Sequence, residues 1–370
     1  MIYLDSASIS KPKPEVIETV IDVLQNHWGN ASSVNYDFGL ESARIVQHTR
    51  EVIAEHINCS PDEIIFCGSG SEANTLAIDG FLKANINCNT DYFVCSTIEH
   101  SSILNNPKSK PIVVCNNEGF YDLDWIKEIH NSLVSLQFVN SEVGTIQNIK
   151  EITKILHNNN CIVHTDAVAA FGKMPIDVKD LGIDMLSATS QKIGGIPGAA
   201  FLYVRKGIKI KSIIYGTQEN GLRGSTYNVP AIAGFGKAIE LIDFNEEKEL
   251  KNKRGYLLDK LLSIDSITLN GPNDLDKRIL NNINICIHNC ILDSQQLISV
   301  LDMLNGYCCS AGSACHAGSS EPSHVLKAIG MSDEDAKHSL RITIEDNTYE
   351  ELDEFYNDFK NIVEQYKIDN

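Results

Sequence analysis

The chain has 370 residues, 43% of them hydrophobic, and a formal net charge of -18 at pH 7. This length exceeds one ordinary hydrophobic core, so we expect a large domain that carries a smaller one. The negative charge disfavours nucleic acid and membrane partners, because the average surface repels phosphate backbones and anionic lipid headgroups. Residues 1–10 show no basic segment followed by an apolar run, and no apolar stretch approaches the ~20 residues that span a bilayer, so we expect a cytoplasmic protein.

The eleven cysteines are scattered along the chain. Because their number is odd and a chain of this size does not need disulfide bonds to stabilise its fold, we expect reduced thiols and no disulfide framework. Cys286 with Cys290 and Cys308 with Cys309 are near in sequence, but the paired Cys-x-x-Cys knuckles of zinc sites are missing. No metal site is therefore predicted, and these thiols are interpreted as buried or incidental.

The first predicted element is an amphipathic helix over 16–26, which follows Pro12 and Pro14. Between residues 63 and 204, short apolar runs alternate with helical periodicity, which predicts a mostly parallel sheet with crossover helices. The apolar runs are 64–66, 92–94, 112–114, 133–139, 162–163 and 200–204. Charge density rises from Asp243 onward, so we predict an α/β fold with a large domain over 1–243 and a smaller α+β domain over 244–370.

A glycine turn follows the first apolar run. The sequence reads Cys-Gly-Ser-Gly-Ser-Glu-Ala-Asn over 67–74, and a helical pattern follows over 75–82. Free backbone N–H groups and the positive end of a helix dipole can hold a phosphate at such a turn. A left-handed turn with Ser71 as the helix cap explains the pattern equally well. The missing third glycine argues against a dinucleotide fingerprint.

Two further residues end apolar segments. Asp166 closes the run that begins at Ile162, at the strand end where open α/β sheets bind ligands, although an aspartate that caps a helix is the simpler interpretation. Lys192 follows a hydroxyl-rich turn and precedes Gly194 and Gly195. This setting suits a lysine that forms a Schiff base, whereas an isolated lysine is ordinarily a solvated surface residue.

In order and spacing, these segments resemble the class V aminotransferases, a family of pyridoxal 5'-phosphate (PLP) enzymes, and within it the NifS-type cysteine desulfurases. The resemblance runs from Tyr3 to about Arg341. Its landmarks are Gly29-Asn30, the glycine turn, Glu99-His100, the run from Asn140 to Gly144, Asp166-Ala167, Lys192, the run from Arg223 to Thr226, and Ser313-Ala314-Cys315. It implies the PLP-dependent transferase fold type I and conversion of L-cysteine to L-alanine, with the sulfur passed to an enzyme cysteine as a persulfide.

The resemblance also implies how the cofactor is bound. Lys192 would hold PLP as a Schiff base and later carry the α-proton of the substrate. Asp166 would keep the pyridine nitrogen protonated, and His100 would stack on the ring face. The phosphate would be bound by Gly70, Ser71, Thr189, Gln191 and, from the neighbouring subunit of a homodimer, Thr226.

For the substrate, the resemblance implies binding by Asn140, Ser141 and Arg341, with the guanidinium fork of Arg341 on the carboxylate. Cys315 would take the sulfur. It lies in a small, glycine-rich segment over 310–323, where His316 could help to form the thiolate. Without the resemblance, Cys315 and Arg341 would be interpreted as incidental surface residues.

The chain departs from the family at four places. Ser141 replaces an asparagine, Ala169 a glutamine, and Gln191 the histidine before the lysine, while 342–346 is acidic where the family has a second arginine. Two alternatives therefore remain: a PLP-dependent lyase or transferase on another amino acid such as selenocysteine, or a weakly catalytic PLP-binding subunit that carries sulfur or binds a partner. A sulfur-acceptor protein of iron-sulfur cluster assembly or tRNA thiolation is the expected partner.

Overall fold

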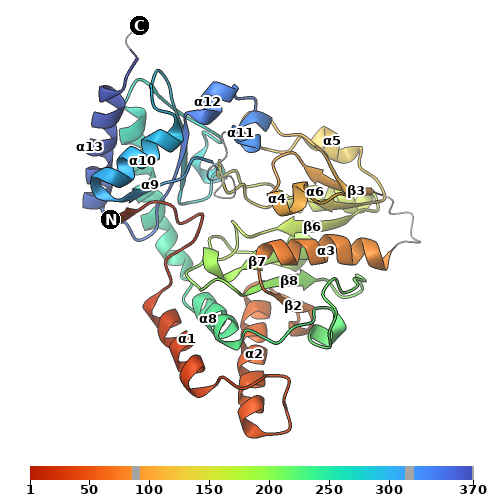
Figure 1. The fold of residues 1–370 in the computed structure, drawn as a ribbon. Coiled ribbons are helices and arrows are strands. Elements are labelled where there is room, and N and C mark those ends of the chain that lie inside the picture. Colours follow the sequence, from red (N-terminus) through yellow and green to blue (C-terminus); the bar gives the residue numbers. More distant parts are fainter. Residues whose placement is uncertain (86–91, 313–320, 369–370) are drawn as a thin grey trace.

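The computed structural model describes residues 1–85, 92–312 and 321–368 (Figure 1). Its centre is a seven-stranded sheet with the order β2-β8-β7-β6-β5-β3-β4. The strands are β2 (Ile64–Cys67), β3 (Tyr92–Ser96), β4 (Ser109–Val113), β5 (Ser132–Ser135), β6 (Ile162–Asp166), β7 (Met185–Thr189) and β8 (Ala200–Val204). Only the pairings of β8 with β2 and β7 are antiparallel. The predicted α/β class with a mostly parallel sheet is confirmed.

Helices cover both faces of this sheet. Every residue of β7 and β8 is buried, as expected where helices pack on both sides. On one face, α3 shares a core with Ile65 and Leu202, and on the other face α2 and α8 share a core with Phe66 and Phe201. The helices of this part are α1 (Pro14–Asn26), α2 (Asp37–His56), α3 (Gly70–Ala84), α4 (Ser101–Leu104), α5 (Leu123–Lys127), α6 (Ile149–Asn158), α7 (Val178–Leu181) and α8 (Val229–Glu240).

Two sequence predictions can be compared directly with this part of the structure. The helix predicted over 16–26 is confirmed as α1, with Pro14 in its first turn. The strand predicted over 133–139 is shorter, because β5 ends at Ser135. The chain stays extended beyond it, since the amides of Leu136 and Phe138 still donate to the carbonyls of His164 and Asp166. This extension leads the backbone past the end of β6.

A second sheet of three antiparallel strands has the order β12-β10-β9. It packs with α9, α10 and α13 around a separate core, in the upper left of Figure 1. The elements around this core are β9 (Ile267–Leu269), β10 (Asn282–Ile287), β12 (Ser339–Thr343), α9 (Glu247–Leu262), α10 (Ser294–Asn305) and α13 (Tyr349–Gln365). The short helices α11 (His324–Ala328) and α12 (Asp333–Lys337) instead share a core with α6 and with β3 and β5 of the large sheet.

The N-terminus belongs to this second core. Strand β1 (Ile2–Tyr3) pairs in parallel with β11 (Tyr307–Cys308), and Ile2 and Leu4 are buried among the residues of the second core. The chain then passes from this core to α1 beside the large sheet, so residues 5–13 run between the two sheets. The domain division at residue 243 stays a prediction. Among the described residues, no helix combines the length and the apolar character needed to cross a membrane.

Candidate active site

A cavity of about 300 Å³ lies where the ends of the large sheet's strands meet the N-terminal segment and the second sheet. It brings together residues that are up to 336 positions apart, from Ala7 to Thr343. The residues predicted from the sequence that line it are Gly70, Ser71, His100, Ser141, Asp166, Thr189, Gln191, Lys192 and Arg341. Such clefts at strand ends are the usual ligand sites of α/β proteins.

The glycine turn forms one wall of the cavity. Helix α3 begins at Gly70, and its cap is the side chain of Ser69, which accepts from the amide of Glu72 at 3.1 Å. The interpretation of Ser71 as the cap is therefore wrong. A Cβ on Gly70 would lie 2.9 Å from Val168 Cγ2, so only glycine fits this close approach. The first turn of a 15-residue helix thus opens onto the cavity, with the N–H groups and dipole that favour an anion.

Asp166, at the end of β6, is held by two hydrogen bonds. Its Oδ2 accepts from Asn74 Nδ2 at 2.8 Å and its Oδ1 from the amide of Val168 at 2.9 Å. No helix starts here, so Asp166 is not a helix cap. Asn74 is 1% exposed, and its Nδ2 also donates to Ser102 Oγ at 3.1 Å. The carboxylate is therefore fixed in orientation at the cavity wall.

His100 is joined to the same network. Its Nδ1 lies 2.8 Å from Ser102 Oγ and accepts from the amide of Ser102 at 3.1 Å, which caps the short helix α4. Because Nδ1 accepts from that amide, the neutral ring carries its proton on Nε2. A continuous series of hydrogen bonds thus connects Asp166, Asn74, Ser102 and His100, and it fixes the orientation of two cavity residues relative to each other.

Lys192 ends a short 3-10 turn that follows β7. Its Nζ donates to the carbonyls of Ala7 and Ser8 at 2.5 and 2.6 Å, so the N-terminal segment lies directly over the amine. A second lysine, Lys173, also lines the cavity. Burial lowers the pKa of Lys173, and the carboxylate of Glu345 partly opposes this effect. Two amines are therefore present in one cavity.

Arg341 of β12 is a buried arginine and not a surface one, with 2% of its surface exposed. Its Nη2 donates to Asp5 Oδ1 at 2.8 Å and to Ser8 Oγ at 2.9 Å, and its Nη1 donates to the carbonyl of Ser141 at 3.2 Å. Its Nε has no hydrogen-bond partner among the described residues. A buried charged donor without a partner is costly, which suits an anionic ligand at this position.

Three predicted site residues are not part of the cavity lining. Asn140 is buried; its Oδ1 accepts from the amides of Glu142 and Val143 at 2.9 Å each, and its Nδ2 donates to the carbonyl of Ile98 at 3.3 Å. Thr226 is exposed and lies outside the lining. Cys315 lies outside the described residues. Their proposed roles in binding, dimerisation and sulfur transfer stay predictions.

Other lining residues were not predicted as site residues. They are Ala7, Ser8, Ser69, Asn74, Gln137, Val139, Val168, Ala169, Lys173, Ile279, Asn281, Asn282 and Thr343. Asn74 follows Gly70 by four positions on α3, so helical spacing from the glycine turn could have indicated it. Asn281 and Asn282 lie before and at the start of β10, and no local pattern connects them with the large sheet.

Glu142 connects the large sheet to the second sheet beside the cavity. Its carbonyl accepts from Asn282 Nδ2 and Asn284 Nδ2 at 3.0 Å each. Its carboxyl accepts from Ser323 Oγ at 2.8 Å, and a Cβ on Gly312 would lie 2.9 Å from it. Burial raises the pKa of Glu142 to about 7, while the bond from Ser323 and the charge of Arg341 oppose the shift.

The chain is similar to proteins of known family. A model of the family described as aminotransferase class-V matches residues 2–355. The chain is 37% identical to "Cysteine desulfurase IscS" of Clostridium botulinum, over 98% of this chain and 94% of that protein. It is 35% identical to "Cysteine desulfurase IscS 1" of Archaeoglobus fulgidus, over 99% of this chain and 98% of that protein.

Solved structures agree with these relatives. A NifS-like protein from Rickettsia africae superposes with a TM-score of 0.87 at 30% identity, covering 98% of this chain and 99% of that one. A structure titled "SspA in complex with cysteine" superposes with a TM-score of 0.79 at 28% identity, covering 93% and 99%. Because the family model and these relatives extend over nearly the whole chain, the chain belongs to the aminotransferase class-V family.

Proposed function

We propose that this chain is a PLP-dependent cysteine desulfurase, which converts L-cysteine to L-alanine and passes the sulfur to its own Cys315. One observation carries the proposal: a single cavity joins Lys192, a fixed carboxylate, a helix N-terminus and a buried arginine. Relatives that match almost the full length are named cysteine desulfurases, which supports the same reaction class for this chain.

The cavity is suited to PLP in size and in chemistry. Its volume of about 300 Å³ is at the lower end of ordinary ligand sites, which span about 300–1,000 Å³. The N-terminus of α3 suits the phosphate, with Gly70, Ser71 and Thr189 as neighbours and Gln191 as a further donor. Asp166 suits a protonated pyridine nitrogen, and Lys192 offers the amine for covalent attachment.

When bound, PLP supplies an electron sink for the electrons left at the substrate Cα. The residues of this chain would transfer the proton, orient the cofactor and bind the substrate. Lys192 Nζ would carry the α-proton, since it lies in the cavity and is an amine. Asp166 would keep its charge directed at the ring nitrogen, because Asn74 and Val168 fix both carboxylate oxygens. His100 would cover the ring face.

Arg341 would bind the substrate carboxylate. Its Nε lacks a partner among the described residues, and its Nη2 is already paired with Asp5 and Ser8. A substrate carboxylate would therefore complete the hydrogen bonding of a guanidinium that is already oriented. Ser141 and Ala169 also line the cavity, where a shorter hydroxyl and a methyl group replace two amides of the family pattern. We expect these two positions to set the rate.

The sulfur step conserves all atoms. The Cβ–S bond of L-cysteine breaks, a bond forms between that sulfur and the Cys315 sulfur, and the protons of the two reactants remain in L-alanine and the persulfide. A reductant then releases sulfide or an acceptor protein takes the sulfur. We propose that the acceptor serves iron-sulfur cluster assembly or tRNA thiolation.

The decisive experiment measures alanine and sulfide from L-cysteine with purified, PLP-loaded protein and a thiol reductant. We expect equal amounts of the two products. Cys315→Ser should retain PLP, whose predicted contacts lie elsewhere, and lose product formation because a hydroxyl is a far poorer nucleophile. If Cys315→Ser formed alanine and sulfide at the wild-type rate, the assignment as a cysteine desulfurase would be rejected, while the assignment as a PLP enzyme would remain.

We further propose a cytoplasmic homodimer. The cysteines described in the structure are free thiols, as expected in a reducing compartment. Thr226 is exposed and is not part of the cavity lining of its own chain, which leaves its side chain available to a second subunit. Sedimentation of a monomer that still binds PLP tightly would contradict the dimer.

A further inference from the structure

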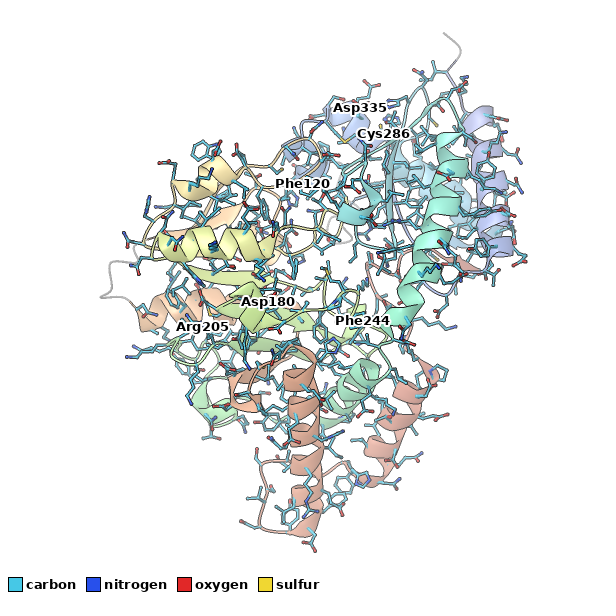
Figure 2. The ribbon with its side chains drawn as sticks, turned by 180° about the vertical axis from the view of Figure 1, so that it is seen from behind. Phe120, Asp180, Arg205, Phe244, Cys286 and Asp335 are labelled. Carbon is cyan, nitrogen blue, oxygen red and sulfur yellow. The ribbon has the colours of Figure 1, made fainter. Side chains whose placement is uncertain are left out.

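Three side chains with metal-ligating atoms meet at one end of the second sheet. Cys286 is in β10, His288 follows it, and Asp335 is in α12. Cys286 Sγ lies 3.9 Å from His288 Nδ1 and 3.8 Å from Asp335 Oδ1, and these two atoms are 3.4 Å apart. Figure 2 shows Cys286 and Asp335 beside each other, well away from the large sheet.

This triangle has the dimensions of a zinc site. With bonds of about 2.3 Å to sulfur and about 2.0–2.2 Å to nitrogen or oxygen, tetrahedral zinc separates its ligand atoms by about 3.3–3.6 Å. The observed separations of 3.4 to 3.9 Å need only a slight contraction. Thiolate, imidazole and carboxylate are also the three protein ligand types that zinc takes.

The atoms that would not bind the metal are held by neighbours. His288 Nε2 lies 2.9 Å from Thr268 Oγ1, and Thr268 faces Cys286 across the β9–β10 ladder. Asp335 Oδ2 accepts from Ser332 Oγ at 2.7 Å. Nδ1 and Oδ1 are therefore turned toward the thiol, and the neighbours supply the outer hydrogen bonds that orient metal ligands.

The burial of the three residues also suits a metal better than a nucleophile. Cys286 is 1% exposed, whereas the side chains of His288 and Asp335 are 38% and 41% exposed, which leaves a path for an ion and a position for water. Burial, and after it the charge of Asp335, raises the pKa of Cys286 to about 12. The thiol is therefore protonated at neutral pH and a poor nucleophile.

We propose that Cys286, His288 and Asp335 bind one zinc ion, with water in the fourth position. Binding would release the thiol proton to solvent. The ion would join β10 to α12, and α12 leads directly into β12, where Ser339 faces Cys286 and Arg341 faces Asn284. The sequence prediction of no metal site considered only cysteine pairs, and the fold instead combines one cysteine with a histidine and an aspartate.

The test titrates the full chain with Co²⁺ after removal of metals by a chelator, and then adds Zn²⁺. We expect one tetrahedral Co²⁺ per chain with a thiolate charge-transfer band, displaced by Zn²⁺. Cys286→Ser should lose the band. Cys290→Ser, which changes another buried thiol outside the cluster, and Cys315→Ser should keep it.

Two surface variants keep the test decisive if Cys286→Ser does not fold. Asp335→Ala should weaken Co²⁺ binding by more than about 100-fold, and Thr268→Val, which removes only an outer hydrogen bond, by about 10-fold. Zinc should raise the melting temperature of the wild type more than that of Asp335→Ala. A wild type without the charge-transfer band, or Cys286→Ser or Asp335→Ala with wild-type affinity, would overturn the proposal.

Discussion

The two halves of the cavity are built in different ways. The half proposed for the cofactor comes from the large sheet, where Gly70, Asp166 and Lys192 each end or follow a strand. The half proposed for the substrate is assembled from Arg341 of the second sheet, from Ser8 near the N-terminus, which accepts a hydrogen bond from Arg341, and from Ser141. Local motifs position the first half, whereas contacts between distant segments position the second. Changes in the first half should affect cofactor binding, and changes in the second should affect substrate affinity.

The largest effect is expected for Lys192→Ala. Removing the amine should abolish covalent attachment of PLP and the associated yellow colour, and should reduce alanine formation by at least about 10²- to 10⁴-fold, the usual contribution of a general base. Visible absorbance and a product assay measure both. The matched control is Lys173→Ala, which removes the other cavity amine and should keep the attachment. If Lys173→Ala lost the attachment of PLP and Lys192→Ala kept it, Lys173 and not Lys192 would be the lysine that carries the cofactor.

A smaller effect, confined to the substrate, is expected for Arg341→Lys. The charge remains, but the Nε donor, which has no partner among the described residues, is lost. One charge-assisted hydrogen bond contributes about 1.5–3 kcal/mol, so KM for L-cysteine should rise about 10- to 100-fold. PLP affinity should not change. A loss of PLP with an unchanged KM would show that the two halves are not separable.

A still smaller effect is expected for Asn74→Ala on the cofactor side. Asp166 would lose one of its two fixed hydrogen bonds while the one from Val168 remains, so PLP should bind about 2- to 10-fold more weakly. The control is Asn148→Ala, which removes an asparagine cap from α6 outside the cavity lining. Equal PLP affinities in wild type and Asn74→Ala would contradict the role assigned to the network.

An effect of another kind, on stability and not on ligand binding, is expected at Glu142, where the two halves join. Its pKa is raised from 4.5 to about 7, so the folded protein binds this proton more tightly than the unfolded chain does. The stabilisation of the folded state by this proton is therefore fully present below pH 4.5 and is lost as the pH rises to about 7. Glu142→Gln does not titrate. The free energy of unfolding of Glu142→Gln, relative to that of the wild type, should therefore rise by up to about 3 kcal/mol between pH 4.5 and 8. Denaturant midpoints across this range measure the difference, and parallel curves would contradict it.

The same contrast explains what the sequence could predict. The alternation of apolar runs gave the mostly parallel sheet, and the positions of Asp166 and Lys192 at strand ends pointed to the cavity. The burial of Arg341 could not be predicted, because its partners Asp5 and Ser8 are more than 330 residues away. The cluster of Cys286, His288 and Asp335 also could not be predicted, because it depends on how α12 packs against β10, and the spacing of residues within either segment does not indicate that packing.

The central claim is that the cavity holds PLP on Lys192, and peptide mapping tests it most directly. Borohydride reduction of the PLP-loaded wild type fixes the cofactor to the amine that carries it, and mass spectrometry of a digest then locates the added mass. The account predicts one added mass per chain, on the peptide that contains Lys192. Added mass on the peptide with Lys173, or none on either peptide, would contradict it.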